Sequence, residues 1–236
     1  MSNSDKSTEN GYLIETRQLR KNFRVGDITI EVLKGIDFYI YPAEIVSIVG
    51  PSGAGKTTFL HLLGLLDRQT AGEIYIEGKS TKEYGEEECA EIRNKMIGFV
   101  FQQHNLLPEF TVLENVMLPG LIAGYQFLDV KEKAYKLLRE LLLEKIINHK
   151  PSMISFGEAQ RVAIARALIN SPKLILADEP TGNLDWETQR EVRKVLWDKV
   201  KENNCAMIFV THDINLAKGA DRILRLINGR MEVLKE

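Results

Sequence analysis

The chain has 236 residues, of which 44% are hydrophobic and 27% are charged, which fits one folded domain or one domain with a small additional lobe. Its net charge of −2 argues against nucleic acid as the main partner, because nucleic-acid-binding proteins usually carry a basic excess. The two cysteines, Cys89 and Cys205, lie far apart without ligand-like neighbours, which argues against a disulfide framework or zinc site and favours a reducing compartment.

The first residues are polar, and we expect a disordered tail over residues 1–11 followed by one folded domain over residues 12–236. The tail lacks the apolar core of a signal peptide. No run of about 20 apolar residues follows, so we expect the chain not to insert into a membrane by itself.

Short alternating runs predict β-strands near both ends of the chain. Between Tyr12 and Ile40 the clearest run is Ile28–Val32, and Glu73–Glu77 shows the same alternation. Near the C-terminus, Arg222–Leu234 is interrupted by Asn228-Gly229, a typical hairpin turn. These runs predict a small β subdomain.

A phosphate-binding loop lies between a strand-like and a helix-like run. The strand-like run Glu44–Val49, which is mostly apolar, precedes Gly50–Thr57, which reads G-x-x-x-x-G-K-[ST]. The helix-like run Thr58–Leu63 follows it. A glycine turn at a helix N-terminus presents backbone N–H groups and a favourable dipole to phosphate. Lys56 is expected to reach the β- and γ-phosphates, and Thr57 to hold Mg²⁺. A glycine turn with an exposed lysine is the alternative, which the flanking strand and helix argue against.

Continuous apolar runs alternate with helical patterns through the rest of the chain. The runs are typical of buried parallel strands and comprise Ile45–Val49, Gly98–Phe101, Leu174–Ala177 and Ala206–Val210. The helical patterns cover Val130–Ile147, Glu158–Ile169 and Trp186–Val200. In the first of them, one face is expected to carry Ala134, Leu137, Leu138, Leu141 and Leu142. This alternation predicts a three-layer α/β fold with a mostly parallel sheet and flanking helices, and a helical subdomain over about residues 102–155.

The longest uncharged stretch is Asn115–Leu128, which contains Pro119, Gly120 and Gly124. It is too short and too interrupted to span a bilayer. It fits either an apolar surface that docks a partner or a buried helix.

Two acids, Asp178 and Glu179, follow the apolar run Leu174–Ala177. Beside a phosphate-binding loop, an Asp at a strand end can hold Mg²⁺, and the adjacent Glu can orient or deprotonate the attacking water. The alternative is an exposed acidic turn, which the upstream loop makes less favoured.

Three weaker signals accompany these motifs. Gln102 follows a strand-like run and can reach Mg²⁺ or the attacking water; His212 ends another strand and can contact the γ-phosphate. Ser155 and Gly157 precede a helix and can offer a hydroxyl and an N–H to an anion. Taken singly, His212 also fits a strand-end turn, and Ser155 a simple helix N-cap.

Taken together and in this order, the motifs resemble the nucleotide-binding subunit of an ABC transporter, from Tyr12 to the C-terminus. The resemblance assigns Gly50–Thr57 to Walker A, Gln102 to the Q-loop, Ser155–Gln160 to the ABC signature, Asp178 to Walker B, Glu179 to the catalytic glutamate, Leu184-Asp185 to the D-loop, His212 to the switch histidine and Phe23 to the aromatic residue that stacks on adenine.

The resemblance implies a P-loop NTPase core with an antiparallel β subdomain and a helical subdomain, and an ATPase that uses ATP and Mg²⁺. The implied catalytic residues are Glu179, His212 and Gln102, and the implied Mg²⁺ ligands are Thr57, Gln102 and Asp178. The implied nucleotide contacts are Phe23, Gly50, Pro51, Ser52, Gly53, Ala54, Gly55, Lys56, Thr57, Thr58, Ser155, Gly157, Glu158 and Asp185.

The resemblance also implies partners. Two copies would sandwich two ATP molecules, and each copy would contact an integral-membrane permease at the cytoplasmic face of the inner membrane. Within the family, Asn105–Thr111, Leu113–Val116 and Asp178–Asp185 look like the lipoprotein-releasing ATPases. The macrolide- and peptide-export ATPases share many of these features, so that transport class is the alternative.

One position departs from the family pattern. The signature usually reads L-S-G-G, whereas Ile154-Ser155-Phe156-Gly157 stands here. A side chain at position 156 restricts the backbone and could crowd a nucleotide. Phe156 therefore motivates a second alternative, an ATP-binding regulatory subunit with little turnover.

Overall fold

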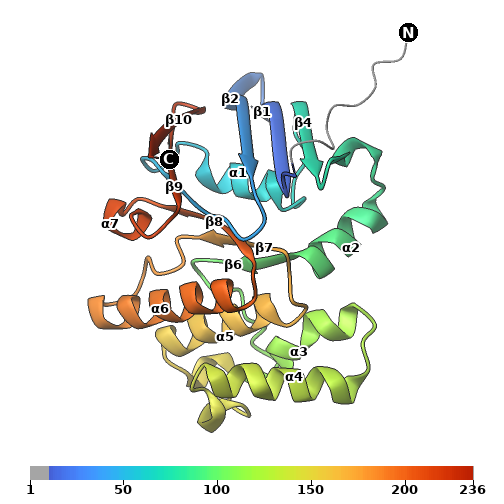
Figure 1. The fold of residues 1–236 in the computed structure, drawn as a ribbon, viewed down its shortest axis with the longest axis vertical. Helices are drawn as coiled ribbons and strands as arrows, with labels where there is room; N and C mark the ends of the chain where they lie inside the picture. The colour runs from blue at the N-terminus through green and yellow to red at the C-terminus, as the bar shows by residue number, and fades with distance from the viewer. Residues whose placement is uncertain (1–10, 236) are drawn as a thin grey trace. The chain divides into compact units, whose positions relative to one another are not determined.

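The computed structural model describes residues 11–235 (Figure 1), and contacts within the chain divide it into two compact units. Among the described residues, the first unit contains 11–90 and 210–235, and the second contains 91–209. Apart from Gly11, the tail predicted over residues 1–11 lies outside the described residues. Within the described part of the chain, no helix has the length and apolar character needed to cross a membrane.

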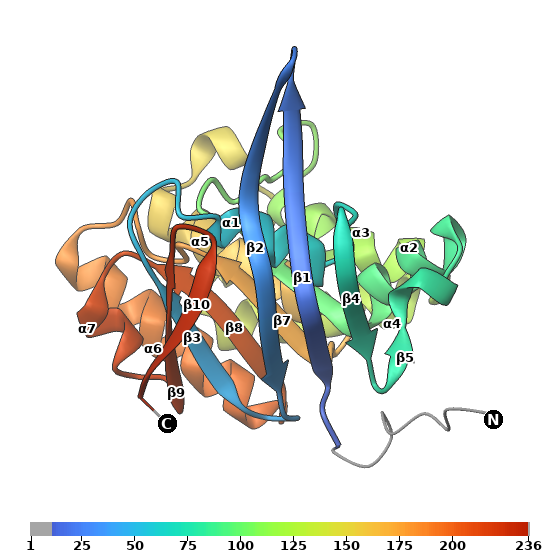
Figure 2. The ribbon, with the colours of Figure 1, turned by 90° about the horizontal axis from the view of Figure 1, so that it is seen from above.

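An antiparallel sheet forms one part of the first unit, with the strand order β2-β1-β4-β5. Its strands are β1 (Ile14–Val25), β2 (Ile28–Ile40), β4 (Ala71–Ile76) and β5 (Lys79–Ser80). Figure 2 shows β1 and β2 as a long hairpin that extends beyond β4. In β2, Ile36, Phe38 and Ile40 alternate with more exposed residues and are buried, as expected for a sheet with one face on a core. The strands predicted at Ile28–Val32 and Glu73–Glu77 are confirmed, and they lie in the antiparallel sheet that the resemblance implied. Residues 222–234 were predicted to join the same β subdomain, and this was wrong, because they pair in a different sheet.

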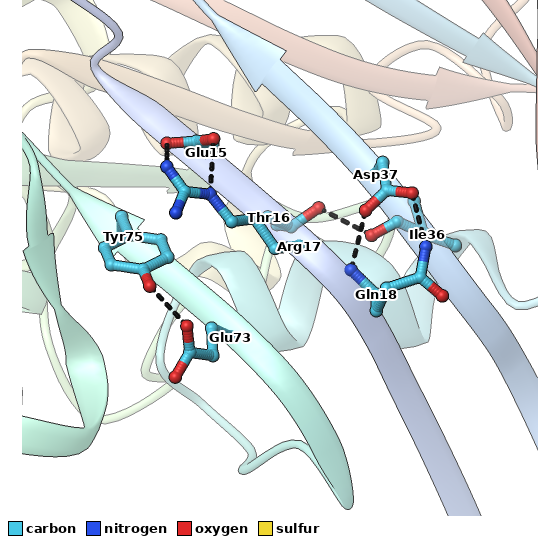
Figure 3. Close-up of polar contacts among 8 residues, drawn as sticks. All are labelled: Glu15, Thr16, Arg17, Gln18, Ile36, Asp37, Glu73 and Tyr75. Carbon is cyan, nitrogen blue, oxygen red and sulfur yellow. Dashed lines mark hydrogen bonds and ion pairs between the residues drawn. The ribbon is translucent and has the colours of Figure 1, made fainter. Parts of the chain in front are cut away.

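Side chains stabilise β1 where its pairing with β2 changes register. The shift lies between Thr16 and Leu19, and Gln18 has a φ of 47°. The Gln18 backbone N–H and side-chain amide donate to the Asp37 carboxylate at 2.7 and 2.5 Å. Thr16 Oγ1 donates to the Ile36 carbonyl at 3.0 Å (Figure 3). These bonds satisfy polar groups that a bulge otherwise removes from the strand ladder.

The first unit also contains further elements, among them the strand and the helix on either side of the phosphate-binding loop. They are β3 (Ile45–Val49), α1 (Lys56–Leu63), η2 (Thr81–Glu83), α7 (Ile214–Ala217), β9 (Arg222–Ile227) and β10 (Arg230–Lys235). Strand β3 pairs in parallel with β9, which pairs antiparallel with β10. All of β3 is buried, as predicted for a parallel strand. Between β9 and β10, Asn228 and Gly229 have φ values of 50° and 76°, the hairpin geometry expected of this dipeptide.

The second unit is mostly helical around parallel strands. Its elements are β6 (Ile97–Val100), α3 (Val112–Ile122), α4 (Phe127–Glu140), η3 (Glu144–Ile146), η4 (Pro151–Met153), α5 (Phe156–Leu168), β7 (Leu174–Asp178) and α6 (Trp186–Glu202). Helix α2 (Glu86–Met96) and strand β8 (Ala206–Thr211) have residues in both units. Strands β6 and β7 pair in parallel. A Cβ on Gly98 would lie 2.5 Å from the Ala167 carbonyl oxygen, so this glycine lets α5 pack closely on β6.

The helix predicted over Val130–Ile147 is shorter than expected, because α4 ends at Glu140. Leu142 has a φ of 59° and is 87% exposed, so its predicted place on the buried helix face is wrong. Leu141 and Leu143 are buried on either side of it. The spacing of apolar residues therefore continues past the helix into an irregular turn, and in this turn it does not indicate helical structure.

The uncharged stretch Asn115–Leu128 is buried at its start and exposed at its end. In α3, Asn115 is 1% exposed, whereas Ile122 and Leu128 are 68% and 75% exposed. The buried-helix interpretation thus describes the first half, and the apolar-surface interpretation describes the second half.

Asn115 ties α3 to the preceding loop. Its Oδ1 accepts from the Leu107 N–H at 2.8 Å. Its Nδ2 lies 3.1, 3.2 and 3.0 Å from the carbonyl oxygens of Leu107, Phe110 and Thr111. The buried amide therefore meets both its donor and acceptor requirements with backbone groups.

Candidate functional site

The phosphate-binding loop in the first unit has the backbone geometry that its sequence predicts. Gly55 is the N-cap of α1 and has a φ of 100°, a conformation that disfavours any other residue. A Cβ on Gly50 would lie 2.2 Å from the Leu226 carbonyl oxygen, so the loop packs against β9 through a bare backbone. Helix α1 begins without a side-chain cap, which leaves its N-terminus suited to an anion.

Lys56 lies over this loop and is only 9% exposed. Its Nζ donates to the carbonyl oxygens of Gly50 and Pro51, at 2.8 and 3.0 Å. Both acceptors belong to the loop itself, so the ammonium group is held where an anion bound by the loop would meet it. The alternative of a solvent-exposed lysine on a simple turn does not describe this geometry.

Phe23 on β1 keeps an aromatic surface in the first unit, since it is 41% exposed. Lys21 Nζ lies 4.9 Å from the centre of its ring. The same ammonium group donates to Asp67 Oδ1 at 2.7 Å and to the Arg68 carbonyl at 2.7 Å. This cation is therefore fixed against a ring that still has surface available for stacking.

His212 follows β8 in the first unit and is exposed. Its neighbours are held firmly. Thr211 is buried and its Oγ1 accepts from the Asp213 N–H at 3.0 Å, while Asp213 caps α7 by accepting from the Asn215 N–H at 2.8 Å. The backbone on both sides of His212 is thus fixed by the strand and by the helix cap.

In the second unit, the two acids lie where β7 ends and a tight turn begins. Asp178 is the last residue of β7 and is half-buried. Glu179 has a φ of 44°, and its carbonyl accepts from the Gly182 N–H at 3.0 Å. A left-handed conformation at a non-glycine residue is uncommon and points to a position that its surroundings determine.

Gln102 lies against that turn. Its Nε2 donates to Asn183 Oδ1 at 3.4 Å, and a Cβ on Gly182 would lie 3.2 Å from the same nitrogen. The structure therefore brings the predicted Gln102 together with the turn that follows Asp178 and Glu179. Asn183 lies within the stretch Asp178–Asp185 quoted for the resemblance but was not predicted as a site residue, and only its place in the turn after the acids could have indicated it.

Ser155 and Glu158 form a capping box at the start of α5. The Ser155 N–H and hydroxyl donate to Glu158 Oε2 at 2.8 and 2.9 Å, and the Glu158 N–H donates to Ser155 Oγ at 3.3 Å. The backbone N–H of Ser155 is the main cause that lowers the pKa of Glu158. The N-cap interpretation of Ser155 therefore describes this structure.

Gly157 and Asp185 are linked through Thr188. A Cβ on Gly157 would lie 2.4 Å from Thr188 Cγ2. Asp185 caps α6, accepting from the Thr188 hydroxyl at 2.6 Å and from the N–H groups of Glu187 and Thr188 at 3.1 Å. The Thr188 hydroxyl is the main cause that lowers the pKa of Asp185. The starts of α5 and α6 thus lie close together, with Asp185 capping α6 and Gly157 leaving room for Thr188.

Phe156, the departure from the signature, begins α5 and is 42% exposed. Its ring packs edge-on against His104, with centroids 4.0 Å apart and an angle of 69°. Burial lowers the pKa of His104, with a further contribution from the charge of Arg166. The sequence prediction included neither His104 nor Arg166. Their roles depend on side chains that meet only after folding.

Comparisons with known proteins agree with these motifs. The family described as ABC transporter matches residues 33–182. The lipoprotein-releasing system ATP-binding protein LolD of Legionella pneumophila (strain Lens) is 45% identical over 222 residues, covering 94% of this chain and 98% of that protein. The protein of the same name from Porphyromonas gingivalis is 49% identical over 217 residues, covering 92% and 97%.

Solved structures give the same result. A bacterial ABC transporter cassette solved as a dimer has a TM-score of 0.87 and 41% identity, covering 94% of this chain and 99% of that chain. A dimeric post-hydrolysis cassette bound to ADP and Pi has a TM-score of 0.86 and 40% identity, with the same coverage of both chains. The predicted P-loop α/β fold and the predicted ABC-type ATPase are thereby confirmed. The chain belongs to the ABC transporter family.

Proposed function

We propose that this chain binds and hydrolyses ATP as the motor subunit of an ABC transporter that releases lipoproteins from the inner membrane toward the outer membrane. The loop between β3 and α1 supports nucleotide binding most directly, because Lys56 is held over an uncapped helix N-terminus. The names of the Legionella and Porphyromonas relatives support lipoprotein release, since the sequences correspond over almost their full lengths.

In the first unit, the phosphates would bind the backbone of residues 50–58, and Lys56 would neutralise charge on the β- and γ-phosphates. Phe23 would stack on adenine, a role supported by its exposed ring. His212 would contact the γ-phosphate from the end of β8, where fixed neighbours limit its movement.

The candidate Mg²⁺ ligands have suitable chemistry. Thr57 in the first unit, and Gln102 and Asp178 in the second, offer a hydroxyl, an amide oxygen and a carboxylate, which are the hard oxygen donors that Mg²⁺ prefers. The contact of Gln102 with the turn after Asp178 supports a shared role for these two. When bound, Mg²⁺ would neutralise charge on the phosphates. Glu179 would orient or deprotonate the attacking water.

Dimerisation would complete each nucleotide site. Ser155 and Gly157 from one copy would meet the γ-phosphate held by Lys56 of the other copy, with Glu158 and Asp185 beside them. The dimeric cassettes among the solved relatives support this arrangement. In the present structure the Ser155 hydroxyl donates to Glu158, so phosphate binding would require that hydroxyl to turn away from its cap partner.

A permease would contact the exposed end of α3 and the residues that follow, Leu121–Leu128. A cavity of about 420 Å³ opens beside this segment, lined by Tyr125, Asp129 and Asn170 among others. Asn170 Oδ1 is buried beside this cavity without a hydrogen-bond partner. The contact with the permease would hold the chain as a peripheral subunit at the cytoplasmic face of the inner membrane.

A low-turnover regulatory subunit is the second candidate, and Phe156 is the observation that favours it. The deciding experiment is the steady-state ATPase rate of the purified chain, alone and with a co-purified permease, beside Glu179→Gln. Hydrolysis that depends on Glu179 supports the motor. ATP-dependent association without hydrolysis, even with the permease present, supports the regulatory subunit and contradicts the proposed motor.

A further inference from the structure

The contact between Phe156 and His104 joins the start of α5 to the segment that follows Gln102. The two ring centroids are 4.0 Å apart. His104 is 7% exposed, whereas Phe156 is 42% exposed. The histidine is therefore the buried partner, and the phenylalanine covers it from the surface.

A second contact holds the same segment to the other end of α5. Arg166, in the last turn of the helix, donates from Nη1 to the Asn105 carbonyl at 2.6 Å and from Nη2 to the His104 carbonyl at 2.5 Å. The segment after Gln102 thus lies along α5, with a ring contact at the first residue of the helix and two hydrogen bonds near its end.

The backbone of this segment needs such support. His104 and Asn105 have φ values of 51° and 50°, in the left-handed region, which is uncommon for residues with a side chain although His and Asn enter it more often than most. Such conformations persist where surrounding contacts determine them. Arg166 holds the carbonyl groups of both residues, and Phe156 holds the imidazole ring of the first.

We propose that Phe156 is a positioning residue that restrains the Gln102 segment against the start of α5. Glycine at this position would provide no such contact, so the departure from the signature adds a restraint. This inference rests on the proposed ATPase function, in which Gln102 must move with the bound nucleotide. The restraint would link that movement to the helix that presents Ser155 and Gly157.

Hydrogen exchange of the full chain without nucleotide tests the restraint directly. In Phe156→Ala, the amides of residues 102–107 should exchange roughly two- to tenfold faster, the range expected for loss of one aromatic pair. Phe156→Tyr keeps the ring and should exchange like the wild type. Leu142→Ala removes an exposed leucine elsewhere in the second unit and should leave this segment unchanged.

A double-mutant comparison separates the ring contact from a general loosening of α5. His104→Ala should accelerate exchange at least as much as Phe156→Ala does, because it also removes the hydrogen bond between the imidazole and the Phe156 backbone. The double variant should show no further increase over His104→Ala. Unchanged exchange in a folded Phe156→Ala protein, or additive effects, would overturn the inference. Because exchange is measured without ATP, this result is independent of turnover, and Glu179→Gln should retain wild-type exchange even if it hydrolyses nothing.

Discussion

Gly157 lies so close to Thr188 that an added Cβ would be 2.4 Å from the threonine methyl group. The close approach joins the first turn of α5 to the first turn of α6. We predict that Gly157→Ala lowers the stability of the second unit by about 1–3 kcal/mol, because overpacking forces neighbouring groups apart. Urea unfolding followed by helix content measures the change.

Thr188→Ser provides a matched rescue. It removes the methyl group but keeps the hydroxyl, which donates a hydrogen bond to Asp185 Oδ2 at 2.6 Å. The Gly157→Ala/Thr188→Ser double variant should therefore regain most of the lost stability. A double variant no more stable than Gly157→Ala would show that the contact with Thr188 is not the cause.

Lys56→Ala should weaken ATP binding by roughly 10- to 100-fold, the range expected when charge-assisted hydrogen bonds are lost. Titration calorimetry with ATP measures the effect. Lys136→Ala makes the same charge change at an exposed position of α4 and serves as the control. Equal affinity of both variants and the wild type would remove Lys56 from the phosphate site.

Glu179→Gln should bind ATP but lose turnover by roughly 100-fold or more, because an amide cannot take a proton from water. The protein should also accumulate as an ATP-dependent dimer, measured by light scattering after size separation. Wild-type turnover in this variant would reassign the base to another residue.

Phe156→Gly should raise kcat by roughly two- to tenfold, because it removes the ring contact that restrains the Gln102 segment. The free energy of one aromatic pair corresponds to about that change in rate. ATPase assays at saturating ATP measure it, and ATP affinity should stay unchanged. An unaltered kcat would mean that the restraint on His104 does not limit turnover.

Leu121→Glu should reduce retention of a co-purified permease by about tenfold or more, because a charge would be placed in an apolar contact. Leu121 is 36% exposed at the end of α3. Leu142→Glu, at a position 87% exposed outside this segment, is the matched control. Equal retention of both variants would move the docking surface elsewhere.

The sequence predicted the strands and the phosphate-binding loop well because their signals are local. Ile45–Val49 reads as a buried strand and is one, and the glycine spacing of the loop reflects backbone conformations required at single positions. The end of α4 was not predictable in the same way. Its apolar spacing continues through Leu141 and Leu143, whereas the backbone leaves the helix at Leu141 and turns left-handed at Leu142.

Contacts between distant segments were also beyond sequence patterns. The bond from Gln102 to Asn183 and the packing of His104 on Phe156 join residues far apart in the chain. The motif alone indicated that Phe156 stands in place of a glycine. The partner that its ring contacts depends on how the loop after β6 lies along α5.

Asn115 gives the loop before α3 a mechanical property. Because one side chain of the helix bonds the backbone at Leu107, Phe110 and Thr111, the loop has little slack relative to α3. A force applied to the helix would reach Leu107 as a displacement and would not be absorbed by bending. Asn115 thus couples α3 rigidly to the loop. Asn115→Ala would keep the helix but leave the loop at Leu107 free to move relative to it.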